Sequence, residues 1–223
     1  MELVYLVTVV KKSQKERFLD FFRKNEVFTF EKTAKGTATA DRMGMLGLTN
    51  REKSVIISVL PWKMARYMLG IIHGALLMNP HTGVAFAVHF DALAGGKLMP
   101  YFAAKDQLSE TTIPKERLME KTNQFELIIA VATKGHVDTV MKAANEKGAK
   151  GGTAVSATNA NIAETEKFFN AEIGEQKEMI YLLVDADKKN DIMQAIASVA
   201  GPSTPARCIV FSMPVSAVAG IGK

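Results

Sequence analysis

The chain has 223 residues, of which 48% are hydrophobic, and it carries 28 Lys and Arg against 23 Asp and Glu. This composition is typical of one large domain or two small ones with a substantial core, and it excludes a mostly disordered chain. The one cysteine, Cys208, excludes an intramolecular disulfide and a thiolate metal cluster within one chain.

The first half of the chain predicts six elements in the order strand, helix, strand, strand, helix, strand. Runs rich in β-branched residues predict the strands, and apolar residues at helical spacing predict the helices. We expect Ser13 to cap the first helix, in which Phe18, Phe21 and Phe22 recur at helical spacing. The predicted elements cover residues 3–10, 13–25, 36–40, 54–61, 62–78 and 83–90.

Residues 97–124 are too polar to form core and contain "TIPKERLMEK", which predicts a short helix with proline near its first turn. We interpret this segment as a linker that packs loosely or crosses to a neighbouring subunit.

The second half of the chain repeats the first. Residues 53–95 align without a gap onto residues 178–220, at a constant offset of 125 residues. Further upstream, "KGTATA" (35–40) matches "GGTAVS" (151–156). The sequence therefore predicts two copies of one unit, repeat one over residues 1–96 and repeat two over residues 125–223, joined by the linker.

The βαββαβ order predicts an α+β fold with two ferredoxin-like repeats, each with both helices on one face of an antiparallel sheet. The strands are nevertheless apolar on both faces: Val84, Phe86 and Val88 alternate with Ala85 and Ala87. A sheet that is wetted on one side shows apolar and polar residues in alternation. We therefore expect other sheets to cover the second face, through oligomerisation.

This pattern resembles the nitrogen regulatory PII signal-transducer superfamily. The resemblance rests on the βαββαβ order, on "GGTA" entering a long mid-domain loop, and on "ETEKFFNAEIGEQKEMIYLLVDADKKNDIMQAI" and the closing "IVFSMPVSAVAGI". It covers nearly all of both repeats, and it is strongest in repeat two.

The resemblance implies a homotrimeric, non-catalytic sensor that binds a small effector, usually an adenine nucleotide, in clefts between domains. It also implies a T-loop after each second strand (41–52 and 158–177) that controls a membrane transporter or a metabolic enzyme. A B-loop before each last strand (78–86 and 201–211) would wrap phosphates. Carried over to this chain, the ligand-binding residues are Gly36, Thr37, Ala38, His81, Thr82, Gly83, Gly152, Thr153, Ala154 and Arg207. We expect Arg42, Arg51, Phe168 and Phe169 to contact the partner protein.

Two departures from the family pattern narrow these expectations. The family's fuller phosphate signature is absent from both repeats, so AMP or ADP is easier to accommodate than ATP, whose additional charges need matching. Neither T-loop contains a tyrosine, which excludes nucleotidylation at such a residue.

The distribution of charge adds a hypothesis about the partner. Residues 1–100 hold 14 Lys and Arg against 8 Asp and Glu, a net +6, and the remaining residues hold 14 against 15, a net −1. The basic half favours an acidic or membrane-proximal surface. It lacks the basic stripe with interleaved aromatic residues that stacks on bases, so we expect no nucleic-acid partner.

Two other functions remain open. One is a small enzyme on a ferredoxin-like α/β barrel, with an ionisable pair such as His89 and Asp91, and the other is a metal-tolerance-type trimer. The histidines show no metal-ligand spacing, and Cys208 has no base near it in sequence. The first residues lack the order of a signal peptide, and "NPHTG" interrupts the longest uncharged run. We therefore expect a cytoplasmic protein.

Overall fold

A computed structural model describes residues 1–37, 52–76, 83–90, 99–108, 124–158 and 176–220 of the chain. The chain forms two compact units, each assembled from segments that lie apart in the sequence. Unit 1 comprises residues 1–33, 53–123 and 215–223, and unit 2 comprises residues 34–52 and 124–214. Each unit therefore takes a short segment from the repeat that builds most of the other unit.

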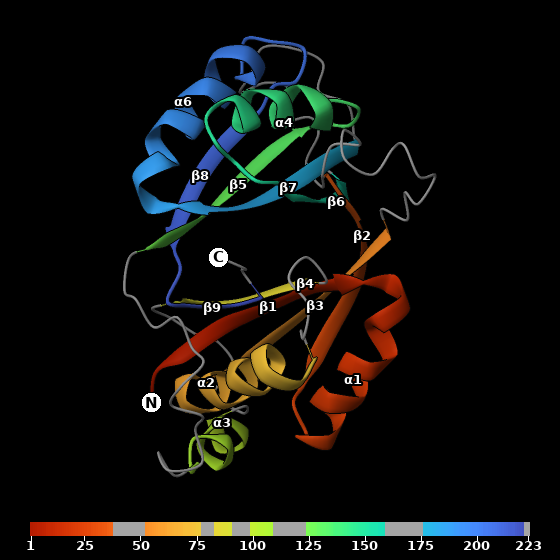
Figure 1. Cartoon of the computed structure of the whole chain (residues 1–223), viewed down its shortest axis with the longest axis vertical. Helices are drawn as coiled ribbons and strands as arrows, with labels where there is room; N and C mark the ends of the chain where they lie inside the picture. The colour runs from red at the N-terminus through yellow and green to blue at the C-terminus, as the bar shows by residue number, and fades with distance from the viewer. Residues whose placement is uncertain (38–51, 77–82, 91–98, 109–123, 159–175, 221–223) are drawn as a thin grey trace. The chain divides into compact units, whose positions relative to one another are not determined.

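Unit 1 is an antiparallel sheet with helices packed against it (Figure 1). Its strands lie in the order β2, β3, β1, β4, β9. The strands are β1 (Leu3–Lys11), β2 (Thr29–Gly36), whose end from Ala34 onward belongs to unit 2, β3 (Glu52–Pro61), β4 (Gly83–His89) and β9 (Ala217–Ala219). The helices are α1 (Lys15–Lys24), α2 (Trp62–Ile71), which continues as a π-helical turn to Leu76, and α3 (Met99–Lys105).

Unit 2 repeats this architecture, with both helices on one face of the sheet (Figure 1). Its strand order is β8, β5, β7, β6, and every recorded pairing is antiparallel. The strands are β5 (Phe125–Thr133), β6 (Thr153–Thr158), β7 (Gln176–Asp185) and β8 (Ile209–Pro214), and the helices are α4 (Val137–Glu146) and α6 (Lys189–Ala200). The expected α+β fold with ferredoxin-like repeats is confirmed.

Each unit has its main core between the sheet and its helices. In unit 1, Phe18 and Phe22 of α1 are buried against Leu6 and Ile56 of the sheet. In unit 2, Ile128 and Ile180 take the corresponding place. Removing side chains of this size from water contributes roughly 1.5–3 kcal/mol each. The predicted spacing of Phe18 and Phe22 on one helical face is confirmed.

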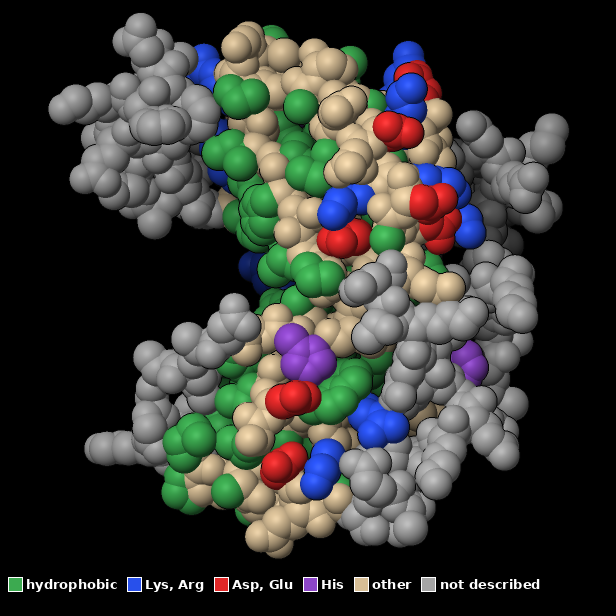
Figure 2. Space-filling model, turned by 90° about the vertical axis from the view of Figure 1, so that its left-hand side faces the viewer, with side chains coloured by type: hydrophobic (Ala, Val, Ile, Leu, Met, Phe, Trp, Pro, Cys, Tyr) green, Lys and Arg blue, Asp and Glu red, His purple; other side chains and the backbone are tan. Residues whose placement is uncertain are grey.

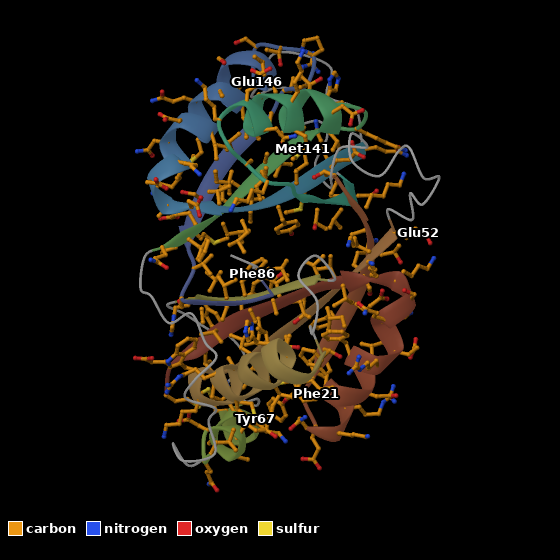
Figure 3. The ribbon with its side chains drawn as sticks, viewed as in Figure 1. Phe21, Glu52, Tyr67, Phe86, Met141 and Glu146 are labelled. Carbon is orange, nitrogen blue, oxygen red and sulfur yellow. The ribbon has the colours of Figure 1, made fainter. Side chains whose placement is uncertain are left out.

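Both faces of β4 are buried, as the sequence predicts. Ala85 and Ala87 belong to the cluster on the helix side, whereas Phe86 and Val88, which alternate with them, are 2% and 5% exposed without belonging to it. Figure 3 labels Phe86 on this strand.

Two local expectations were wrong. Ser13 does not cap the first helix, because residues 12–14 form a 3₁₀ turn and the N-cap of α1 is Gln14, which makes no side-chain capping bond. The second strand begins at Thr29, well before the predicted residue 36, within a stretch whose charged side chains hide the strand pattern. Residues 38–40 of the prediction lie outside the described residues.

The described part of the linker, residues 99–108, is anchored to unit 1 and does not pack loosely. Phe102 of α3 is 3% exposed. The Tyr101 hydroxyl accepts a hydrogen bond from the amide of Phe28 at 3.0 Å, and Lys105 Nζ donates to Glu26 Oε2 at 2.9 Å. The hydrogen bond and the charge of Lys105 lower the pKa of Glu26. The helix predicted within residues 112–121 lies outside the described residues.

Candidate anion-binding site

Basic side chains gather where β5 ends and β7 begins in unit 2. The register of this antiparallel pair places Thr133, the last residue of β5, opposite Lys177, the second residue of β7. Lys177 Nζ donates a hydrogen bond to Thr133 Oγ1 at 3.0 Å. Lys177 was predicted as the last residue of the second T-loop, and the structure instead places it within a strand.

Arg207 is held beside this pair by the loop that joins α6 to β8. The loop begins at Gly201, where a Cβ would lie only 2.2 Å from the carbonyl oxygen of Ala197, so glycine is required there. Backbone bonds fix the other end: the amide of Thr133 donates to the carbonyl of Ala206 at 2.9 Å, and the amide of Cys208 donates to that of Ala200 at 2.7 Å.

The backbone of Arg207 is unusual for a residue with a side chain. Its φ is +43°, in the left-handed region that few non-glycine residues adopt. Strain of this kind persists only where the surrounding structure enforces it, and it concentrates at functional sites. The conformation therefore marks Arg207 as a candidate for a role other than folding.

The electrostatics of the cluster favour an anion. Burial, and then the nearby charge of Arg207, lower the pKa of Lys177. Among the described residues, no carboxylate forms an ion pair with either cation. A bound anion would offset both effects, because it would stabilise the protonated ammonium group.

Two neighbouring groups complete the surroundings of Lys177. Lys134 Nζ donates to Gln176 Oε1 at 2.5 Å. Glu178 supplies a negative charge, but its Oε2 accepts from the amide of Gly135 at 2.9 Å. Glu178 follows Lys177 directly in β7, so the two side chains leave opposite faces of the sheet.

The two "GTA" motifs meet in unit 2. Antiparallel pairing of β2 with β6 places Gly36 opposite Thr153 and Lys35 opposite Ala154, and the amide of Thr37 donates to the carbonyl of Gly152 at 3.0 Å. These predicted residues lie at the start of β6, whereas Lys177 of β7 pairs with Ala157, near the other end of β6. The structure thus brings the motif residues together, but not with Arg207.

The hydroxyl group of Thr37, next to the paired ends of β2 and β6, makes no hydrogen bond to the described residues. Its Oγ1 is buried and has no hydrogen-bond partner among the described atoms. The predicted ligand contact of Thr37 therefore stays a prediction.

Gly152 is required by packing. A Cβ there would lie 2.9 Å from the carbonyl oxygen of Tyr181, 3.2 Å from Thr37 Oγ1 and 3.3 Å from Sδ of Met141. Figure 3 labels Met141, a buried residue of α4. The backbone oxygen of Tyr181 cannot move aside as a side chain can.

We predict that Gly152→Ala lowers the free energy of unfolding by about 1–3 kcal/mol, the usual cost of overpacking. Chemical denaturation of the two proteins would measure the difference. Gly135→Ala is the control, because nothing lies within 4 Å of the position of its Cβ. That variant has no packing clash, and the only destabilisation expected comes from its φ of +94°. An unchanged midpoint for Gly152→Ala would contradict the packing role.

Unit 1 carries basic residues at the corresponding end of its sheet. Lys11 closes β1 and lies opposite Lys53 in β3. Burial, and then the charge of Lys11, lower the pKa of Lys53. Like charges that face each other across strands destabilise a sheet, so this pair also favours a bound anion.

The sequence analysis missed Lys177, Lys53 and Lys11 as site residues. Strand pairing could have identified them. In this fold the first and third strands of each repeat are antiparallel neighbours, so residues at the end of the first strand lie opposite residues at the start of the third.

The other predicted site residues are distributed as follows. Gly83 opens β4, opposite Val10. Eight predicted residues lie outside the described residues: Ala38, Arg42, Arg51, His81, Thr82, Asp91, Phe168 and Phe169.

The alternative catalytic and metal sites gain no support from the described residues. His89 contacts Ser216 Oγ through Nδ1 at 2.5 Å and Glu2 through Nε2 at 3.6 Å, and its ring packs on Trp62. Within the described ranges, no three His, Cys, Asp or Glu side chains gather as a metal site would require. Cys208 is buried, which raises the pKa of its thiol to about 11.

Comparison with known proteins adds a structural resemblance. The sequence matches no protein-family model and no curated protein. Solved structures that resemble it include Arabidopsis thaliana PII bound to citrate (18% identity, 42% of this chain and 77% of that chain, TM-score 0.33). The B. subtilis GlnK–ATP complex is another (11% identity, 43% and 86%, TM-score 0.34). An unknown protein from Galdieria sulphuraria covers 96% of this chain and 99% of its own, at 10% identity and a TM-score of 0.29.

PII proteins are thus among the solved structures that the chain resembles. At these identities the likeness concerns the fold alone. Among the described helices, none is both long and apolar enough to cross a membrane.

Proposed function

We propose that this chain is a non-catalytic, PII-like regulatory protein of the cytoplasm, which binds a small phosphate-bearing anion at Lys177 and Arg207. The observation that carries the proposal is the pair of cations held together at the end of unit 2 without an ion-paired carboxylate among the described residues. Arg207 offers a planar fork that suits phosphate oxygens, and Lys177 offers a point charge.

The position of the site supports a regulatory role. Residues 159–175 connect β6 to β7, and β7 begins at Gln176, next to Lys177. An anion bound at Lys177 therefore lies at the base of this connection, which contains Phe168 and Phe169. We propose that binding changes the availability of these residues, and of Arg42 and Arg51 in repeat one, to a target such as a transporter or a metabolic enzyme.

The charges set the class of effector. Lys134, Lys177 and Arg207 supply three positive charges, and Glu178 supplies one negative charge nearby. This balance suits AMP or ADP better than ATP, because unmatched phosphate charges are costly to desolvate. We propose an adenine nucleotide in a homotrimer, with Gly36, Thr37, Gly152, Thr153 and Ala154 as further candidates for contact.

Thermal shift and titration calorimetry with AMP, ADP, ATP and 2-oxoglutarate test the proposal. A ligand at a hundredfold excess over its Kd stabilises the native state by about 2.7 kcal/mol, which such an assay detects readily. We expect Lys177→Met to weaken binding about tenfold, whereas Lys142→Met, which removes an exposed lysine of α4 in the same unit, leaves it unchanged. Equal affinity in wild type and Lys177→Met, or no response to any of the four anions, would refute the proposal.

The affinity should also depend on pH. Anion binding requires protonated Lys177, whose pKa is lowered in the free protein. Affinity should therefore fall as pH rises through that lowered value, earlier than for an ordinary lysine. Calorimetry across an alkaline pH series would measure the decline, and Lys177→Met should abolish this component of it.

A further inference from the structure

A cavity of about 430 Å³ lies in unit 1, where the linker helix α3 packs on the rest of the unit. Three parts of the chain line it. They are the corner after α1 (Lys24, Asn25 and Glu26), Met64 in the first turn of α2, and the end of α3 with the residues that follow it. A cavity of this volume is in the usual range for sites that bind small molecules.

The wall at the corner after α1 is fixed by the linker. Glu26 has a φ of +53°, which is strained for a residue with a side chain. The Tyr101 hydroxyl donates to the carbonyl of Glu26 at 3.2 Å, and Lys105 Nζ donates to the carbonyl of Asn25 at 3.0 Å. Strain of this kind persists only where the surrounding structure enforces it, and it concentrates at functional sites. The corner and α3 therefore form a preorganised wall.

The hydrogen bonds of this wall leave donors for a ligand. The amides of residues 25–27 already donate to carbonyl groups in the last turn of α1. The Lys105 ammonium group has three N–H donors, and two of them go to the carbonyl of Asn25 and to Glu26 Oε2. One donor of Lys105 is thus unused among the described atoms. An acceptor group on a ligand would complete the set.

The charges at the cavity favour an anion as that acceptor. Lys24 and Lys105 carry two positive charges, and Glu26 is the one carboxylate among the described residues that line the cavity, which leaves one net positive charge. Glu26 is paired with Lys105 at 2.9 Å, whereas no described carboxylate pairs with Lys24. Figure 2 shows unit 1 from the side on which α3 lies in Figure 1, and basic and acidic side chains stand there next to each other among hydrophobic ones.

Other side chains that line the cavity are apolar. Met64 is 5% exposed and belongs to the core of unit 1, and Leu108 packs against the same core. Ala104 also lines the cavity, with a side chain too small to fill it. A hydrocarbon group placed on these side chains would be removed from water, which is favourable. The cavity therefore joins an apolar surface to a cation without an ion-paired carboxylate.

We propose that this cavity binds a small monocarboxylate with an apolar body, such as a short-chain fatty acid. The carboxylate accepts hydrogen bonds from the ammonium groups of Lys24 and Lys105, and the hydrocarbon chain covers Met64 and Leu108. This site goes beyond the proposed function, because the linker builds it and all of its residues belong to unit 1. A ligand that contacts both α3 and the corner after α1 also stabilises the docked linker.

Hexanoate is the probe, and NMR titration of the full chain would measure its affinity. Acetate lacks the apolar body and 1-hexanol lacks the charge, so each should bind at least tenfold more weakly than hexanoate. A chain that does not bind hexanoate would overturn the proposal. Equal affinity for hexanoate and 1-hexanol would also overturn it, because the cations would then play no part.

Two tryptophan variants of α3 test the location of the site. Ala104→Trp fills the cavity, and Ala103→Trp is the matched control, because both alanines are exposed on α3 but Ala103 does not line the cavity. We expect at least tenfold weaker hexanoate binding for Ala104→Trp and wild-type affinity for Ala103→Trp. If Ala104→Trp binds hexanoate as tightly as wild type, the ligand lies elsewhere.

A lysine variant keeps the test valid if tryptophan disturbs the linker. Lys24→Met should weaken hexanoate binding about three- to fivefold, because an exposed ion pair contributes little. Lys32→Met, which removes an exposed lysine of β2 in the same unit, should leave the affinity unchanged. Equal affinities of Lys24→Met and Lys32→Met would exclude Lys24 from the site and contradict the proposed contact.

Lys177→Met separates this site from the one in unit 2. It should weaken nucleotide binding and leave hexanoate binding unchanged, whereas Ala104→Trp should do the reverse. Loss of hexanoate binding in Lys177→Met would place the carboxylate at Lys177 and overturn the proposal for unit 1. A chain that binds hexanoate but no nucleotide would refute the proposed function and leave this site in place.

Discussion

Ala219→Asp will destabilise unit 1 by about 3 kcal/mol or more, although this residue lies almost at the end of repeat two. Ala219 is 1% exposed and belongs to the helix-side cluster of unit 1, where it pairs with Ala85. A carboxylate at this position would lose its hydration without gaining a partner in the cluster, which is among the costliest single changes.

Chemical denaturation would measure the loss, and Ala197→Asp is the matched control. Ala197 is exposed on α6, so the same substitution there costs only a fraction of a kcal/mol in helix propensity. Hydrogen exchange would locate the effect: peptides of β1 and β4 should lose protection, whereas those of β5 and β7 should keep it. Loss of protection in β5 and β7 alone would show that β9 does not belong to unit 1.

Arg207→Gly will separate binding from stability. Its φ of +43° costs an L-residue about 1–2 kcal/mol, a strain that glycine does not have. The variant should therefore be as stable as wild type, or more stable by up to about 1 kcal/mol once the flexibility of glycine in the unfolded chain is counted. The same variant should bind a nucleotide at least tenfold more weakly, because it lacks the guanidinium group.

Denaturation and calorimetry on one preparation would test both halves of this prediction. Glu26→Gly is the control, because Glu26 is the other described non-glycine residue with a positive φ, at +53°, and lies in unit 1. It should leave nucleotide affinity unchanged. If Arg207→Gly binds nucleotide as tightly as wild type, Arg207 does not belong to the site. If the variant has a lower free energy of unfolding than wild type, Arg207 stabilises the fold.

Arg207 and β9 both lie near the end of a sheet: Arg207 has a strained backbone, and β9 pairs with a strand of the other repeat. β9 is held against β4 by backbone hydrogen bonds and by His89, whose Nδ1 contacts Oγ of Ser216, the residue just before β9. Arg207 is held by the bonds of Ala206 and Cys208 on either side. In both cases the anchoring is local, so single substitutions can test each segment alone.

The sequence by itself determined the local structure and the duplication. Alternation of β-branched residues identified β1, β3 and β4 within a few residues, because side chains in a strand must suit two buried faces. Helical spacing identified α1 through Phe18 and Phe22. The offset of 125 residues predicted two copies of one unit.

Only the tertiary structure decided which distant segments meet. It paired β9 with β4, placed Gly36 opposite Thr153, and set Arg207 near Lys177. Local periodicity reports which face of an element is buried, but it holds no information about the strand that lies alongside. Helix α3 depends on tertiary structure in the same way, because it is stabilised by the buried Phe102 and by bonds to the corner after α1, contacts that form only once unit 1 has folded.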